Sequence, residues 1–103
     1  MMSSLTVFDF GQGPVPAHQH PNGGGWVADT ACVGKNAFVD SSSMVYETAR
    51  VLDYALVSGG SRVHGRALLT DYSYVIDQGE VAGETQLHGH ECVEGPAPVV
   101  KKG

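Results

Sequence analysis

The segment "VLDYALVSGGSRVHGRALL" (Val51–Leu69) carries an aliphatic residue at every sixth position, namely 51, 57, 63 and 69. A small residue, Ala or Ser, lies two places before each of the last three aliphatics. This period is neither the roughly 3.6 residues of an α-helix nor the roughly two residues of a free β-strand. The segment therefore predicts a structure that repeats in units of six residues.

The six-residue period extends far beyond this segment in both directions. It holds at twelve consecutive positions: Val27, Val33, Val39, Val45, Val51, Val57, Val63, Leu69, Val75, Val81, Leu87 and Val93. The residue two places before each aliphatic is also small from position 31 to position 85, and Glu91 ends this second series. A fixed period over so many positions indicates a repeat architecture that ends near Glu91.

Strand geometry explains why a chain would repeat in sixes. In a strand, residues i and i−2 point to the same side, so the small residue and the aliphatic of each unit face inward together. Glycines at 59–60, 65, 83 and 89 fall where the chain must turn a corner. Three corners close a triangle, and coils of 18 residues then stack about 4.8 Å apart. We predict an all-β fold, a triangular β-solenoid of about 3.7 coils over residues 26–94.

This pattern resembles the hexapeptide-repeat, left-handed parallel β-helix family over residues 26–94. The left hand is implied by the resemblance alone, because crossovers between parallel strands are usually right-handed. The start of the repeats, Gly24-Gly25-Trp26-Val27, is also similar to small phage-encoded hexapeptide-repeat proteins that begin with Gly-Gly-Trp-Val. That similarity implies a phage-derived protein.

Two flanking segments lie outside the repeats. Residues 1–25 predict a short apolar strand over 4–10, followed by a loop over 11–25 that is rich in Pro and Gly. The apolar residues of the strand are expected either to cap the first coil or to dock on a partner; they are Leu5, Val7, Phe8 and Phe10. Residues 95–103 predict an extended tail, in which Pro and Lys would discourage end-to-end stacking.

The 18-residue stack also predicts which residues share the outer surface. Phe38, Leu56 and Tyr74 form one apolar file that continues to Cys92, and Tyr72 is expected to stack on Tyr54 at a corner. Isolated exposed apolar residues are normal, but a cluster of aromatics and leucines favours an interface. Members of the resembled family are commonly trimers, which implies a homotrimer. The expected interface residues are Phe38, Leu52, Tyr54, Leu56, Leu68, Tyr72, Tyr74 and Ile76.

The histidines and cysteines offer only a weak metal site. His88, His90 and Cys92 alternate along the chain, and His18 and His20 lie near the N-terminus. Imidazole and thiolate suit zinc, but the six-residue frame sends the first three side chains to two faces and a corner. We therefore expect cap packing rather than metal binding, and no cofactor. Cys32 and Cys92 would lie too far apart along the axis for a disulfide, so free thiols are expected.

Composition and apolar patterning indicate which partners and locations to expect. The formal net charge is −5 with six Lys and Arg in 103 residues, which argues against nucleic acid as a partner. No apolar run is long enough to span a membrane, and the first ten residues lack the features of a signal peptide, so cytoplasmic synthesis is expected.

The fold alone does not fix the activity, since resembled proteins include enzymes. Resembled acyltransferases build pockets from loops that interrupt the repeats. The repeats here are uninterrupted, so they indicate no position for a pocket, and His64 is expected at the surface or in an interface. We expect a non-enzymatic structural or assembly protein, phage-derived, such as a virion decoration or tail-associated protein that contacts other virion proteins. The alternatives are a trimeric hexapeptide acyltransferase or γ-carbonic-anhydrase-like metalloenzyme, and a module that binds ligands on host surfaces.

Overall fold

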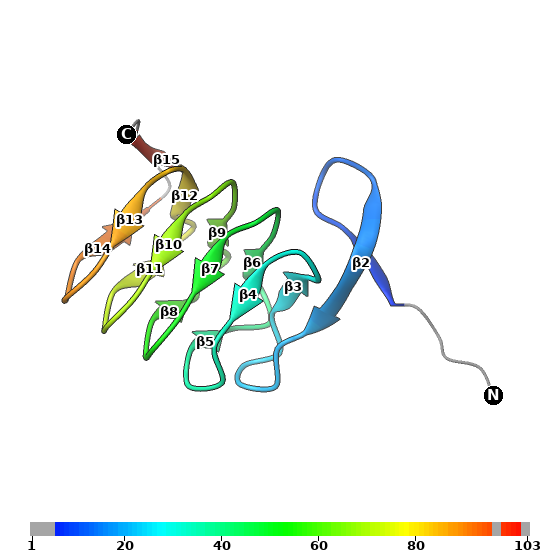
Figure 1. The fold of residues 1–103 in the computed structure, drawn as a ribbon, viewed down its shortest axis with the longest axis horizontal. Coiled ribbons are helices and arrows are strands. Elements are labelled where there is room, and N and C mark those ends of the chain that lie inside the picture. The colour runs from blue at the N-terminus through cyan, green and yellow to red at the C-terminus, as the bar shows by residue number, and fades with distance from the viewer. Residues whose placement is uncertain (1–5, 96–97, 102–103) are drawn as a thin grey trace.

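The computed structural model describes residues 6–95 and 98–101. Within these residues the chain forms strands and turns without a helix. Twelve short strands, β3 to β14, follow one another at three per turn and build four stacked coils of a β-solenoid (Figure 1). The bounds are β1 Val7–Asp9, β2 Pro14–Gln19, β3 Trp26–Ala28, β4 Cys32–Val33, β5 Phe38–Val39, β6 Met44–Val45, β7 Arg50–Val51, β8 Leu56–Val57, β9 Arg62–Val63, β10 Leu68–Leu69, β11 Tyr74–Ile76, β12 Glu80–Gly83, β13 Gln86–Leu87, β14 Cys92–Glu94 and β15 Pro98–Lys101.

The strands stack into three parallel faces, as the 18-residue coil predicts. One sheet has the order β1-β2-β3-β6-β9-β12-β15, a second β13-β10-β7-β4 and a third β14-β11-β8-β5. Neighbouring strands in the solenoid pair in parallel at an offset of 18 residues, for example Val57 with Val75. The three sheets thus enclose one narrow core that runs the length of the coils.

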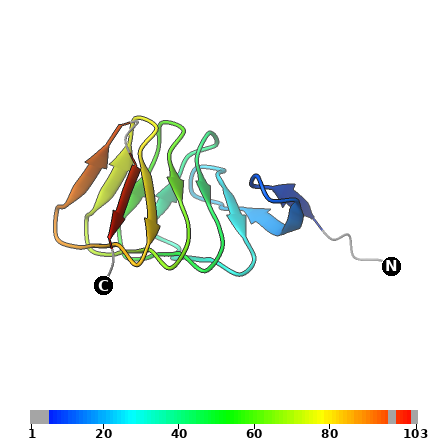
Figure 2. The same cartoon turned by 90° about the horizontal axis from the view of Figure 1, so that it is seen from above.

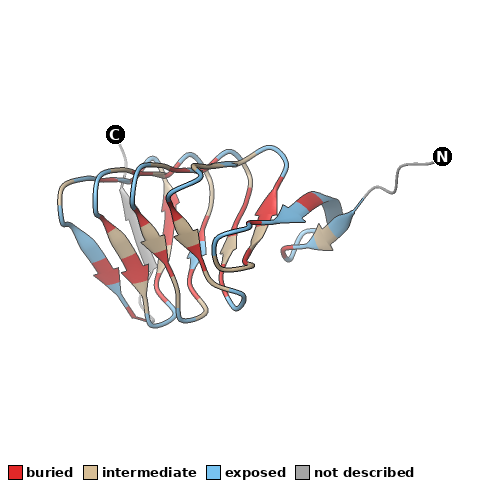
Figure 3. Ribbon diagram, turned by 90° about the horizontal axis from the view of Figure 1, so that it is seen from below, coloured by how far each residue is buried: buried red, intermediate tan, exposed pale blue. Residues whose placement is uncertain are grey.

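The core consists of the two inward series. Every aliphatic of the six-residue series is buried except Val33, which is half-buried on β4 at the end of its sheet. The small residues are buried without interruption from Ala37 to Thr85. Figure 3 shows the same alternation, with buried segments along the strands and exposed corners between them. The predicted inward positions are confirmed for the aliphatic series, with Val33 half-buried, and for the small residues from Ala37 to Thr85.

The corners use glycine, as expected, but they also use acidic residues. Gly65 and Gly89 have φ of 71° and 60°, in the left-handed region that favours glycine. Asp53 and Asp71 adopt similar φ values of 58° and 60°. The N–H of Asp71 donates to Asp53 Oδ2 at 2.9 Å, and the N–H of Gly89 donates to Asp71 Oδ2 at 2.9 Å. Each carboxylate therefore caps a backbone donor of the next coil, which offsets the strain of its own conformation.

The N-terminal segment contains a strand where the sequence predicts a loop. β2 pairs antiparallel with both β1 and β3, so it covers the edge that β3 would otherwise expose (Figure 2). The carbonyl of Pro16 accepts from the N–H of Asp29, one residue beyond the end of β3 at Ala28. Pro16 has no N–H to return a second bond, so the ladder between β2 and β3 weakens only at its last pair, beyond the end of β3. The prolines are therefore compatible with the strand.

The C-terminal segment also differs from the prediction. β15 pairs in parallel with β12, with Val99 opposite Val81, so the sheet continues beyond the predicted boundary at residue 94 (Figure 2). Val99 lies six residues after Val93 and continues the aliphatic series. Glu91 occupies an expected inward position but is exposed, and its Oε1 accepts from the N–H of His88 at 3.0 Å. The repeat is therefore irregular at Glu91 but does not end there, because the chain goes on to form β15.

Candidate functional site

The predicted apolar file lies on the sheet β14-β11-β8-β5. Phe38 pairs with Leu56, Leu56 with Tyr74, and Tyr74 with Cys92, so the four side chains follow one line along the axis. The first three are half-buried within the chain and Cys92 is exposed. The neighbouring Ile76 is also half-buried on the same sheet. We call Phe38, Leu56 and Tyr74 the apolar file.

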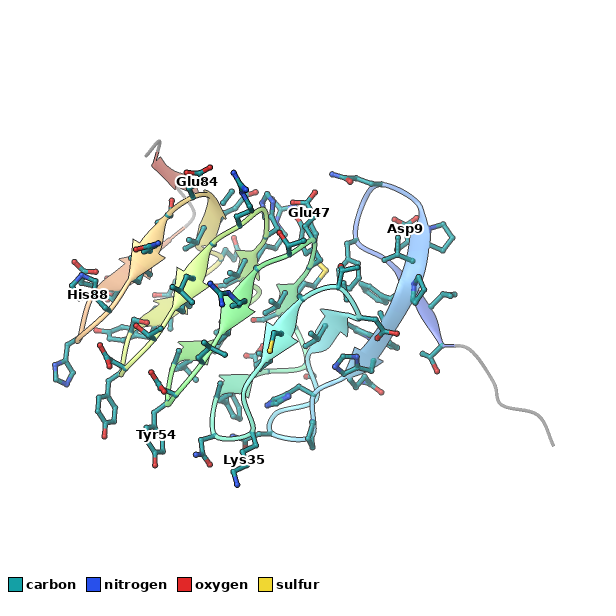
Figure 4. All side chains as sticks on the ribbon, in the orientation of Figure 1. Asp9, Lys35, Glu47, Tyr54, Glu84 and His88 are labelled. Carbon is teal, nitrogen blue, oxygen red and sulfur yellow. The ribbon has the colours of Figure 1, made fainter. Side chains whose placement is uncertain are left out.

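An aromatic ladder lies at the corner beside this file. The rings of Tyr54 and Tyr72 stack at 5.4 Å with an angle of 8°, and Tyr72 stacks on His90 at 5.5 Å and 14°. Both tyrosines are 56% exposed, which is unusual for residues of this size. Figure 4 shows Tyr54 pointing away from the corner into solvent. Leu52 and Leu68, on the adjoining face, are half-buried. We call Tyr54, Tyr72 and His90 the aromatic ladder.

The histidines singled out in the sequence do not converge with Cys92. His90 belongs to the aromatic ladder, whereas His88 lies beside Glu91 with 3.8 Å between Nε2 and Oε1. At the other end, His18 Nδ1 lies 2.8 Å from Asp29 Oδ1, and the buried His20 contacts the carbonyl of Ala37 at 3.0 Å. Residues 6–95 and 98–101 contain no group of three His, Cys, Asp or Glu arranged to hold a metal ion.

The two cysteines lie apart, as expected. Cys32 on β4 and Cys92 on β14 are both free and exposed. Tyr74 neighbours Cys92, and a hydrogen bond to this thiol raises the pKa of the tyrosine. The prediction of free thiols is confirmed.

The N-terminal hairpin packs its aromatic residues on the first coils. Phe8 stacks on Trp26 with centroids 4.7 Å apart, and the buried Phe10 stacks on Tyr46 at 4.9 Å. Val7 points outward and is 47% exposed, and Leu5 lies outside the described residues. The hairpin is thus held to the solenoid by aromatic contacts as well as by the pairing of β2 with β3.

His64 lies at the centre of a charged network next to this hairpin. Its ring stacks on Tyr46 at 4.7 Å and 5°. Nδ1 lies 3.2 Å from Glu47 Oε1, and Nε2 lies 2.6 Å from Glu80 Oε2. Both ring nitrogens of His64 therefore face carboxylate oxygens. The network reaches Arg62, whose Nη2 lies 3.2 Å from Glu80 Oε1. The sequence placed His64 on the outer surface but gave no sign of this network.

Glu47 joins the network to the hairpin. Its Oε1 accepts from the N–H of Gly65 at 2.7 Å, and its Oε2 accepts from Gln12 Nε2 at 3.3 Å. Partial burial alone would raise the pKa of Glu47, but the hydrogen bond from Gly65 and the interactions with His64 and Gln12 together lower it. Glu47 is therefore held in its charged form at the edge of the hairpin.

A cleft of about 320 Å³ opens between the hairpin and the first two coils. Ten residues line it: Phe10, Gln12, Gly13, Val15, Pro16, Ala28, Asp29, Thr30, Tyr46 and Glu47. The repeat pattern indicated no position for this cleft. The repeats are uninterrupted, as expected, but the cleft is built by the hairpin rather than by a loop within the repeats. The interpretation of residues 11–25 as loop concealed the strand that forms one wall.

Comparison with protein-family models, with curated proteins and with solved structures finds no significant match for this chain. The solenoid is therefore established by the structure itself. No helix capable of crossing a membrane occurs within the described residues.

Proposed function

We propose that this β-solenoid is a non-enzymatic structural or assembly protein that forms a homotrimer through the prism edge made by the apolar file and the aromatic ladder. The proposal includes the finer features implied by the resemblance, namely the hexapeptide-repeat family and its left-handed coil. The similarity of Gly24–Val27 to phage-encoded proteins supports a virion as the setting, with decoration or tail association as the role.

The observation that carries the proposal is the alignment of large apolar side chains along the axis. Phe38, Leu56 and Tyr74 lie in register on three successive coils, and the tyrosines of the ladder are more than half exposed beside them. A rigid, straight array of this kind is suited to contact an identical array on another copy. Aromatic residues are enriched in interface cores, and closed cyclic symmetry is the usual form of soluble oligomers.

The energetic gain is sufficient if the edge is covered. Each large apolar side chain contributes about 1.5–3 kcal/mol when it passes fully from water into an interface. The residues of the file are already half-buried, so each contributes less than this, whereas the exposed tyrosines contribute nearer the full value. Several such residues per copy offset the entropic cost of association.

Sedimentation velocity and light scattering on the wild type and on Leu56→Glu test the proposal. We expect a trimer for the wild type and a monomer for the variant, because a carboxylate in the covered edge would lose water without gaining a partner. Thermal melting of Leu56→Glu checks that the solenoid remains folded, as expected for a side chain on the outer surface.

Gln19→Glu provides the matched control. Gln19 is an exposed residue of β2, in the sheet that carries neither the apolar file nor Leu52 and Leu68, and this variant adds the same single negative charge there. It should remain trimeric. A wild type that stays monomeric at high concentration, or a Leu56→Glu variant that stays trimeric, would contradict the proposal.

A further inference from the structure

The cleft between the hairpin and the solenoid is independent of the proposed trimer edge. One wall is β2 with the turn before it, which contributes Gln12, Val15 and Pro16. The floor is formed by Phe10 and Tyr46, whose rings stack 4.9 Å apart at 17°. A volume of about 320 Å³ falls at the lower end of the range of roughly 300–1,000 Å³ that small-molecule pockets occupy. The size suits a single ring with a short side chain.

The charged groups that line the cleft are all acidic. Of the ten lining residues, Asp29 and Glu47 are acidic and none is basic. The lowered pKa of Glu47 keeps its carboxylate ionised, and Oε2 receives only the 3.3 Å hydrogen bond from Gln12 among the contacts described above. A carboxylate has about four acceptor sites, so Glu47 retains capacity for a cationic donor. Figure 4 shows Glu47 on the side of the solenoid that faces the hairpin.

We propose that this cleft binds a small organic cation with an apolar body, its ring against Phe10 and Tyr46 and its ammonium group at Glu47. The apolar walls, including Phe10 and Tyr46, supply burial for the ring of the ligand. The carboxylate supplies a charge-assisted hydrogen bond and rejects anions of the same shape. This site extends the protein's role beyond assembly to ligand binding.

Three probes of matched shape but different charge test the proposal: 2-phenylethylamine, 2-phenylethanol and phenylacetate. Each is titrated into the ¹⁵N-labelled full chain while backbone amide shifts are followed. We expect saturable shifts at Gln12, Thr30 and Glu47 with the amine. The alcohol should bind several-fold more weakly, and phenylacetate should bind at least tenfold more weakly than the amine.

Two variants locate the charge effect. Glu47→Gln keeps an oxygen to accept from Gly65, and it should reduce the affinity for the amine to about that for the alcohol. Val15→Lys introduces a cation on the hairpin wall, so it should weaken the amine and strengthen phenylacetate. Glu84→Gln is the control, because Glu84 is an exposed corner carboxylate that pairs with Arg66 outside the cleft. It should bind all three probes as the wild type does.

Several outcomes would overturn the proposal. These are no saturable shift with the amine, shifts that map away from the cleft, and phenylacetate binding as tight as amine binding. Unchanged affinity for the amine in both Glu47→Gln and Val15→Lys would also overturn it. Because Leu56 lies on a different sheet from the cleft, Leu56→Glu should retain amine binding, which separates this proposal from that of the trimer.

Discussion

At the scale of single residues, the direction of each side chain decides what substitution does. Val57 is fully buried between its neighbours in the coils above and below, whereas the next residue, Ser58, is half-buried on the outer side. The same chemical change should therefore have different effects at adjacent positions, because only one of them removes a charge from water.

We predict that Val57→Asp unfolds the chain, and that Ser58→Asp lowers its stability only slightly. Burial of a valine contributes about 1.5–3 kcal/mol, and an unpaired buried carboxylate adds a larger penalty. Circular dichroism with thermal melting measures both variants. Equal stability of the two would mean that the inward and outward positions are assigned wrongly.

Glu47 predicts how stability depends on pH. Its pKa in the folded chain lies below the unfolded value, so its contribution is fully present above the unfolded pKa. That contribution is lost as the pH falls through the folded pKa, because the proton then binds and the charged interactions with His64 and Gly65 weaken.

The wild type should accordingly be more stable than Glu47→Gln at neutral pH, and the difference should shrink as the pH falls from the ordinary glutamate pKa of 4.5 through the lower pKa of the folded chain. Urea unfolding at a series of pH values measures it. Glu84→Gln, at an exposed corner, serves as the control for general charge effects and should show a smaller difference at neutral pH. A constant gap between the wild type and Glu47→Gln at every pH would show that the carboxylate charge is not what stabilises this site.

At the scale of the element, the corners are the most constrained parts of each coil. Gly65 has φ of +71°, and a Cβ there would lie 2.7 Å from the backbone N of Gly83 in the next coil. Gly89 has a similar φ of +60°, but a Cβ there meets nothing within 4 Å. A comparison of substitutions at Gly65 and Gly89 therefore distinguishes the free-energy cost of the backbone conformation from the cost of close contact between coils.

We predict that Gly89→Ala destabilises the chain by about 1–2 kcal/mol, the cost of a left-handed conformation for a residue with a Cβ. Gly65→Ala should cost distinctly more, because the clash adds to the same conformational strain. Chemical denaturation of both variants gives the comparison. If the two losses were equal, the coils would be able to separate at this corner without cost.

At the scale of the whole molecule, the two ends of the solenoid govern whether chains associate. A stack of coils presents open strand edges at both ends, and such edges promote association between chains. Here β2 pairs with β3 at one end, and the bend that follows β2 returns to the solenoid, where the N–H of Gly25 donates to the carbonyl of Val39 at 2.8 Å. The N-terminal segment thus covers edges on two of the three faces.

Removal of residues 1–19 should therefore cause end-to-end association or loss of folded structure. The truncation exposes the edge of β3 together with the apolar surface of Trp26 and Tyr46, on which Phe8 and Phe10 stack. Size-exclusion chromatography and electron microscopy would detect filaments or aggregates. Phe10→Ala is a milder companion that keeps β2, and it should lower the melting temperature without causing filaments. A truncated chain that behaves like the wild type would show that the hairpin is not a cap.

The solenoid can be predicted from the amino-acid sequence, because the aliphatic and small residues recur at a period that only an 18-residue triangular coil places on one side. The apolar file and the stacking of Tyr72 on Tyr54 can be predicted as well, since residues 18 apart become neighbours in a parallel stack. Repetition makes these contacts readable, because one local rule applies to every coil.

The features at the junction between the repeats and the N-terminal segment could not be predicted in this way, because they depend on three-dimensional packing. The Pro-rich β2 carries no strand signal of its own, and it forms because β1 and β3 supply partners on its two sides. The cleft, and the position of Glu47 between His64 and Gln12, follow from where that hairpin docks. No spacing in the chain encodes these contacts, because they depend on aromatic packing between residues far apart in the sequence.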